Sequence, residues 1–141
     1  MQKPVTLILS LLLSTFFACS NSDTSLRNTR NDTITGMISY RDDSKIPGTS
    51  DIIIRLLEMG DGENKVINEM TMKTGERGIP FPFALPFDKP SIEKDKKYAL
   101  DIDIKFIQAN LYYTLEPIEV LSNGLQRDVS VILVKGPKPQ D

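Results

Sequence analysis

Apolar side chains recur at every second position over most of the chain from Thr33 onward. A period of two places such residues on one face of an extended strand. The alternation predicts about seven strands, with turn-forming residues between them and no long helical pattern. They span residues 33–41, 51–59, 65–74, 78–87, 98–107, 111–115 and 129–134. Short strands at close intervals are typical of an all-β fold, here a small antiparallel β-sandwich of the immunoglobulin-like or transthyretin-like kind.

The stretch GIPFPFALPF, residues 78–87, combines strand alternation with three prolines, all at even-numbered positions. Proline has no N–H to donate and is normally confined to sheet edges. The prolines therefore remove donors from one edge of the strand, where Ala84 alone keeps its N–H. The odd-numbered residues supply a core face and an intact edge; they are Phe81, Phe83, Leu85 and Phe87. The pattern predicts an edge strand that resists the addition of further strands; an irregular proline-rich loop is the alternative.

The first 18 residues have the pattern of a secretory signal. Lys3 is followed by an apolar run from Val5 to Ala18. This run is shorter than the ~20 residues that a membrane-spanning helix needs. A cation, then a short apolar segment, then a small residue before the expected cleavage site are the features of a signal peptide. A buried N-terminal helix is the alternative, but the run lacks the polar face that such a helix needs.

Cys19 is the only cysteine of the chain, and it follows Ala18 directly. This junction resembles a bacterial lipobox, although Phe16 and Phe17 depart from the usual leucine and small residue. The resemblance implies that Cys19 carries lipid after the signal is removed. Signal cleavage without lipidation is the alternative. The polar stretch that follows, up to Asp32, cannot pack and is expected to be a disordered tether.

These patterns divide the chain into four parts. Residues 1–18 are the predicted signal peptide, and residues 19–32 the tether with Cys19 at its start. Residues 33–135 form the predicted β-sandwich. Residues 136–141 contain two prolines and are expected to form a flexible tail.

The composition narrows the range of functions. The chain has 17 basic and 19 acidic residues and no histidine. The balance of charge provides no basic surface for nucleic acid. Without histidine, the Ser-His-Asp and Cys-His arrangements and most zinc sites are excluded. Asp101 and Asp103 could together bind a hard cation, but we interpret them as the solvated face of a strand. We therefore expect no catalytic residue, cofactor or metal.

Three residues of the 51–59 strand suggest contact with a partner. Ile53, Arg55 and Leu57 share one face, and the alternation places that face outside the core. Apolar residues on an outward face indicate either a binding surface or a region that other parts of the chain cover. Both readings stay open, with loops or the 88–97 connection as the candidate cover.

The proline stretch also carries a family resemblance. The run from Thr74 to Asp88, followed by Tyr98-Ala99-Leu100, resembles the YbaY-type lipoproteins, which are grouped with the YscW-type pilotin lipoproteins of type III secretion. The opening Ile34-Thr35-Gly36 and the final Val131–Val134 fit the same pattern, and the order of segments follows the YbaY branch more closely.

The resemblance implies an exported lipoprotein with one small β-sandwich. In the pilotin branch such a protein helps a secretin to reach the outer membrane. With Ser20 after Cys19, resemblance to bacterial sorting rules implies the outer membrane, on its periplasmic side. We expect a non-enzymatic accessory or chaperone-like module that binds the membrane through its lipid and an outer-membrane or secretion-system protein through its domain. A structural envelope lipoprotein without a client is the alternative.

Replacement of the predicted lipid site tests the anchor. Labelled palmitate fed to cells is expected to enter the wild-type protein and not Cys19→Ala, because only the thiol accepts the acyl group. The variant is also expected to keep its signal peptide. A wild-type protein without label would contradict the lipoprotein assignment and leave a soluble secreted domain.

Overall fold

The computed structural model describes residues 31–122 and 127–139, and these residues form eight β-strands and one short 3₁₀ helix. The strands are β1 (Asn31–Tyr40), β2 (Asp51–Met59), β3 (Lys65–Lys73), β4 (Phe81–Asp88), β5 (Lys97–Phe106), β6 (Ala109–Tyr113), β7 (Ile118–Val120) and β8 (Asp128–Lys135). The 3₁₀ helix, η2 (Lys89–Ser91), follows β4 directly.

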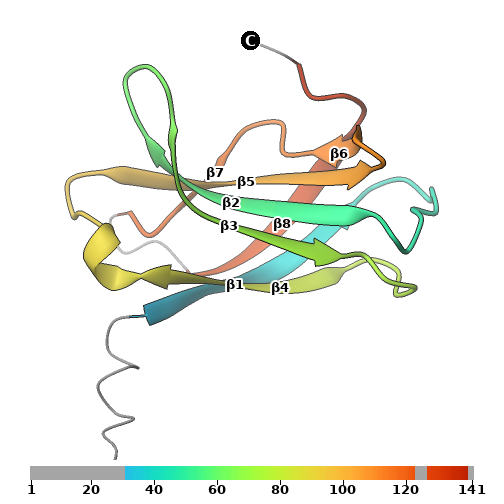
Figure 1. Ribbon diagram of the computed structural model, residues 1–141, viewed down its shortest axis with the longest axis horizontal. Coiled ribbons are helices and arrows are strands. Elements are labelled where there is room, and N and C mark those ends of the chain that lie inside the picture. The colour runs from blue at the N-terminus through green and yellow to red at the C-terminus, as the bar shows by residue number, and fades with distance from the viewer. Residues whose placement is uncertain (1–30, 123–126, 140–141) are drawn as a thin grey trace, which may run out of the picture.

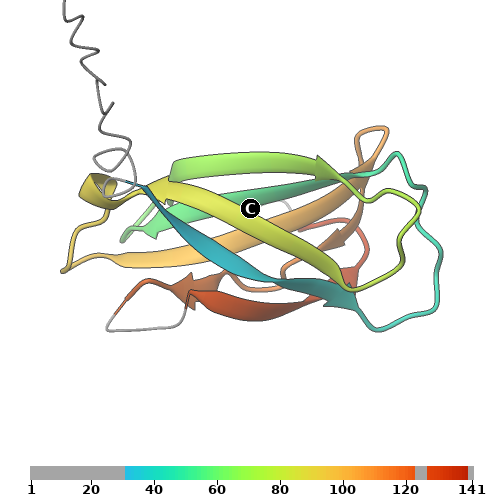
Figure 2. The ribbon, with the colours of Figure 1, turned by 90° about the horizontal axis from the view of Figure 1, so that it is seen from below.

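The strands form one curved sheet in the order β3-β2-β5-β6-β8-β1-β4, and β7 pairs with β5 beside β6. Only two residue pairs join β6 to β8, so the sheet bends sharply at that point. We call β4, β1 and β8 layer A, and the remaining strands layer B. The two layers fold over one another and nearly close into a barrel (Figures 1 and 2).

The all-β prediction is confirmed, with two differences in detail. The three-residue strand β7 adds an eighth strand, and its length is too short to show a clear alternation. In addition, β1 and β8 are parallel, whereas the remaining pairs among the described strands are antiparallel. A parallel pair requires a long crossover. Here nearly the whole domain lies between the two strands, a pairing that local patterns cannot reveal.

The core lies between the layers and consists of the inward-facing residues of both. Layer A contributes the alternate residues of β1, β4 and β8, and layer B contributes the even-numbered residues of β2 and β5. The fully buried large side chains are Ile34, Ile38, Ile52, Ile54, Leu56, Leu85, Tyr98, Leu100, Ile102, Ile104, Val120 and Val131. The period of two that defined the strands is thus also the pattern of burial.

The proline-rich strand lies at the sheet edge, as predicted. Among the described residues, β4 pairs with β1 alone, and its four odd-numbered residues are buried while Pro82, Ala84 and Pro86 are exposed. The strand begins at Phe81, so Gly78 to Pro80 belong to the preceding loop. The free edge of β4 faces β3, which is the other edge of the sheet. Asn68 of β3 donates a side-chain hydrogen bond to the Pro86 carbonyl across this gap, at 2.5 Å.

Gly36 allows β1 to pack closely against both of its neighbours. It lies opposite Phe83 in the β1–β4 register. A Cβ atom at this position would overlap the Val129 carbonyl oxygen of β8 and come within 2.8 Å of the Phe83 ring. The aromatic ring therefore covers the bare backbone of the glycine, and no larger residue fits without displacing a strand.

Truncation of Phe83 tests the inward parity of β4. Loss of a buried phenylalanine typically costs about 3–5 kcal/mol, a large share of the ~5–15 kcal/mol that stabilises a domain of this size. Phe83→Ala is therefore expected to leave little folded protein at physiological temperature, by circular dichroism during urea titration. The control is Ala84→Ser on the exposed face, which is expected to cost far less. Equal losses in both variants would contradict the parity.

Candidate functional site

The described domain has two distinct ends. Asn31, where β1 begins, lies at one end, and the loops 41–50 and 74–80 lie at the other (Figure 2). Cys19, the predicted lipid site, lies outside the described residues. The chain that leads to Cys19 enters the domain at Asn31, so the loops 41–50 and 74–80 form the end remote from it.

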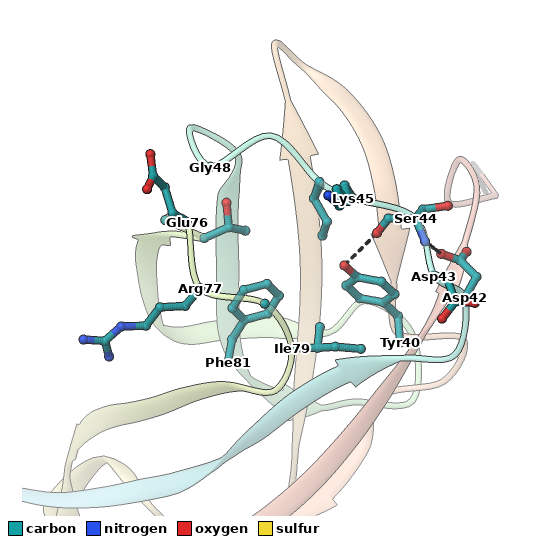
Figure 3. A pocket seen from close by; sticks show the side chains of 14 residues that line it. Tyr40, Asp42, Asp43, Ser44, Lys45, Gly48, Glu76, Arg77, Ile79 and Phe81 are labelled. Carbon is teal, nitrogen blue, oxygen red and sulfur yellow. Dashed lines mark hydrogen bonds between the residues drawn. The ribbon is translucent and has the colours of Figure 1, made fainter.

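A pocket of about 570 Å³ opens at this remote end (Figure 3). Its walls are the two loops, and Tyr40, Ile79 and Phe81 form an apolar floor. Charged side chains surround the mouth: Asp42, Asp43, Lys45, Glu76 and Arg77. The pocket combines an apolar interior with a rim of both charges.

Two tyrosines hold the first of these loops in place. The rings of Tyr40 and Tyr112 stack with their centroids 4.3 Å apart. The Tyr40 hydroxyl donates to the Ser44 carbonyl at 3.0 Å, and the Tyr112 hydroxyl donates to Asp42 Oδ1 at 2.6 Å. The Ser44 N–H donates to the same carboxylate oxygen at 2.9 Å. The bonds from Tyr112 and Ser44 lower the pKa of Asp42 to about 2, and burial together with the Asp42 bond raises the pKa of Tyr112 to about 12.

The outer face of layer A is an open sheet surface. It includes one carboxylate, because Asp128 of β8 lies beside Thr35 of β1 and accepts a hydrogen bond from its hydroxyl at 3.2 Å. Met37 of β1 and Ile132 of β8 are 48% and 53% exposed there. The exposed prolines and alanine of β4 continue the face on one side. On the other side, Ile132 and Leu115 line a groove whose walls also include the charged residues Arg41, Asp42 and Lys135. Exposed apolar residues that gather on one face mark a surface that can bind another protein.

The predicted contact residues Ile53, Arg55 and Leu57 lie on the outer face of layer B, which is much less open. Leu57 is only 8% exposed and Ile53 is half-buried. Leu57 borders a pocket that the 113–117 segment and residues 138–139 also line, and the 88–97 connection does not contribute to it. Contact between these residues and a partner stays a prediction.

Arg55 is the centre of a charged network on this face. Its Nη1 lies 2.6 Å from Asp103 and 3.3 Å from Asp101, and its Nε lies 2.8 Å from Glu69. Burial lowers the Arg55 pKa, but the bonds to Asp103 and Glu69 outweigh it, so the pKa lies above its ordinary value. The expectation that Asp101 and Asp103 form a solvated face is wrong, because they are 6% and 3% exposed. The central strand β5 is buried on both faces, so its polar residues are enclosed as well.

Lys138 approaches the same network from the segment after β8. Its Nζ lies 2.6 Å from Asp101 Oδ1, which also accepts a hydrogen bond from the Thr114 hydroxyl at 2.8 Å. Burial raises the pKa of Asp101, but the bonds from Lys138 and Thr114 outweigh it, so the pKa lies below its ordinary value. Gly136 N–H also donates to the Leu111 carbonyl, so residues 136–139 rest against the domain.

In the part of the chain that the structure describes, we find no cluster of three or more acidic, histidine or cysteine side chains that could hold a metal ion. Within the same residues, none of the helices has the length and apolar character to cross a membrane.

The comparisons relate this two-layer β-domain to proteins of bacterial secretion. The model of the type III secretion system lipoprotein chaperone (YscW) family matches residues 29–133, and the chain belongs to this family. The structure of an alternative pilotin from the type II secretion system of Vibrio cholerae has the same fold, with a TM-score of 0.69 and 21% identity. The match covers 76% of this chain and 100% of that chain. Curated proteins show no match.

Reasoning from the sequence missed the open face of layer A. The signal was present in the alternation of β1 and β8, where Met37 and Ile132 occupy outward positions among small polar residues. Their proximity depends on the parallel pairing of β1 with β8, which brings together the two ends of the domain sequence. The outward residues of the 51–59 strand were predicted as the contact surface instead, because their pattern is visible within a single segment of the sequence.

The Tyr112–Asp42 bond predicts a pH dependence at both extremes. The Asp42 pKa falls from 3.8 to about 2, so its contribution to stability is present above 3.8 and is lost as the pH falls towards 2. The Tyr112 pKa rises from 10.0 to about 12, so its contribution is present below 10.0 and is lost as the pH rises through 12. We expect Tyr112→Phe to return the Asp42 pKa towards its ordinary value, measured from the NMR shift of its carboxyl carbon. Tyr113→Phe, the same change one residue later, is the control, and an equal effect there would contradict the assignment.

Proposed function

We propose that this protein is a lipid-anchored chaperone of the pilotin type, which binds an outer-membrane protein of a secretion system and helps it to reach the outer membrane. The observation that carries the proposal is the family match over residues 29–133, which spans almost the whole described domain. The fold shared with the Vibrio cholerae pilotin agrees with this role.

The client is proposed to dock by its side chains on the outer face of layer A. This face exposes Met37 and Ile132, and their partners in the β1–β8 register, Ser130 and Ser39, carry no charge that a client would have to desolvate. Addition of a client strand to β4 is disfavoured, because each proline leaves an incoming carbonyl without a donor, at a cost of about 1–3 kcal/mol when buried. An apolar segment of the client that lies across the sheet fits this surface better than an added strand.

The anchor is proposed to be lipid on Cys19, at the outer membrane and facing the periplasm. Several acyl chains on one cysteine are enough to hold a protein at a bilayer. A non-enzymatic role fits a chain without histidine, whose single cysteine is used for the lipid. Placement in the YbaY branch of the family rests on the proline stretch and the order of segments, and belongs to this proposal.

The test follows the client between the two membranes. In cells that lack this protein, we expect the secretion-system outer-membrane protein to sediment with the inner membrane on a density gradient. The wild-type gene is expected to restore it to the outer membrane. Cys19→Ala is expected to bind the client without delivering it. Correct delivery in the absence of the protein would overturn the proposal and favour a structural envelope lipoprotein without a client.

Two variants test the binding face. Met37→Asp combined with Ile132→Asp places charges on the open face at exposed positions, so the fold is expected to survive while client binding falls at least about tenfold. Ile107→Asp is the matched control, since Ile107 is an exposed apolar residue at the β5–β6 turn, away from layer A. An equal loss in the control would show that this face has no special part in binding.

A further inference from the structure

The buried part of the Arg55 network has an excess of negative charge. Asp101, Asp103 and Arg55 are largely enclosed, whereas the Glu69 side chain is 49% exposed and is solvated by water. The enclosed region of layer B thus holds two carboxylates and one guanidinium. Burial of an unbalanced charge is costly, so the second carboxylate needs a second cation. In this structure Lys138 supplies that cation from outside the sheet.

Lys138 satisfies the site only in part. Its Nζ lies 2.6 Å from Asp101 Oδ1 but 3.9 Å from Asp103 Oδ1, which is beyond hydrogen-bonding distance. Asp103 Oδ1 is buried and has no hydrogen-bond partner among the described residues. A buried carboxylate oxygen without a donor is destabilising. This oxygen lies 3.9 Å from Lys138 Nζ, so the ammonium leaves one of the two neighbouring carboxylate oxygens without a donor.

A guanidinium matches this arrangement better than an ammonium does. Arginine presents several N–H donors in a planar fork, whereas the lysine ammonium is a compact point charge. Two donors of one fork can reach two neighbouring acceptors. Asp101 Oδ1 and Asp103 Oδ1 are such acceptors, because Lys138 Nζ lies within 3.9 Å of both.

The segment that carries Lys138 is held by few contacts. Residues 136–139 follow β8 and belong to no strand. Among the described residues, the segment is tied to the domain by the Lys138 contacts and by one backbone hydrogen bond, from Gly136 N–H to the Leu111 carbonyl. Lys138 itself remains about one third exposed. A stronger cation can therefore displace it without breaking a strand.

The surroundings of the site suit a polypeptide ligand. A pocket of about 540 Å³ lies beside Asp101 and Thr114. Its apolar walls outside the Lys138 segment are Leu57, Val66, Tyr113, Leu115 and Pro117. An arginine flanked by apolar residues would place its guanidinium on the carboxylates and its neighbours against these walls.

We propose that Asp101 and Asp103 form a binding site for an arginine side chain of a second polypeptide, and that Lys138 occupies this site in the free protein as a displaceable internal ligand. Displacement releases residues 136–139 and opens the apolar pocket. That the second polypeptide is the secretion-system client rests on the proposed function, whereas the affinity of the site for a guanidinium does not.

Ethylguanidinium is the probe for the site itself. We would titrate it into the full-length, signal-processed protein and follow the backbone amides of Asp101, Asp103 and Thr114 by NMR. Lys138→Met removes the internal ligand and is expected to bind the probe about tenfold more tightly than the wild type, because nothing competes. Lys138→Arg fills the site with the better group and is expected to bind the probe more weakly than the wild type.

Two controls separate the site from general charge effects. Ethylammonium is expected to bind Lys138→Met more weakly than ethylguanidinium, and tetramethylammonium, which has no N–H donor, is expected not to bind. Lys135→Met removes a nearby surface cation and is expected to leave the affinity for the probe unchanged. Two results would overturn the site while leaving the pilotin function intact. One is an equal affinity of Lys138→Met and the wild type for ethylguanidinium, and the other is that the probe shifts only amides outside the site.

The same variants test whether the client uses the site. Lys138→Met is expected to bind the client more tightly than the wild type, and Lys138→Arg less tightly. Unchanged client binding in both variants would overturn the assignment of the arginine to the client. Because the Met37 and Ile132 variants test the open face of layer A separately, a failure here is distinguishable from a failure of the proposed function.

Discussion

One-sided hydrogen bonding of β4 is the constraint on which the rest of the structure depends. The prolines confine pairing to the edge that faces β1, and the same parity sends Phe81, Phe83, Leu85 and Phe87 into the core. The sheet must therefore end at β4. It curves until this edge faces β3, where Asn68 meets the Pro86 carbonyl. The two layers and the core between them follow from an edge that cannot accept another strand.

The enclosed position of β5 is the second constraint on the structure. A strand with neighbours on both sides, and with further segments above its outer face, buries residues of both parities. The inner parity fills the core with apolar side chains. The outer parity buries Asp101 and Asp103, which the fold tolerates because Arg55 and Lys138 lie against them. Buried carboxylates of this kind require cations, and one of the two cations belongs to a terminal segment rather than to the sheet.

The proposed functions lie on different surfaces of the domain. The chain enters at Asn31, and the pocketed loops lie at the far end. The open face of layer A lies between them and exposes Met37 and Ile132. Layer B carries the enclosed charges beneath residues 136–139. In the proposed role, a client contacts apolar residues on one layer and one charged site on the other, and the chain that leads to the proposed anchor enters at a separate end.

Local patterns in the sequence determined the strands, the inward parity of β4 and its position at an edge, because each depends on residues within about ten positions of one another. The same patterns could not show that β1 and β8 are parallel neighbours, since that pairing joins the two ends of the domain. For the same reason they placed Asp101 and Asp103 in solvent and missed the face formed by Met37 and Ile132. Burial of an outward residue depends on what crosses above it, and Lys138 reaches Asp101 only after the whole sheet has folded. Only the tertiary structure decides such contacts, because the residues that make them belong to segments far apart in the chain and are stabilised by packing that forms when those segments meet.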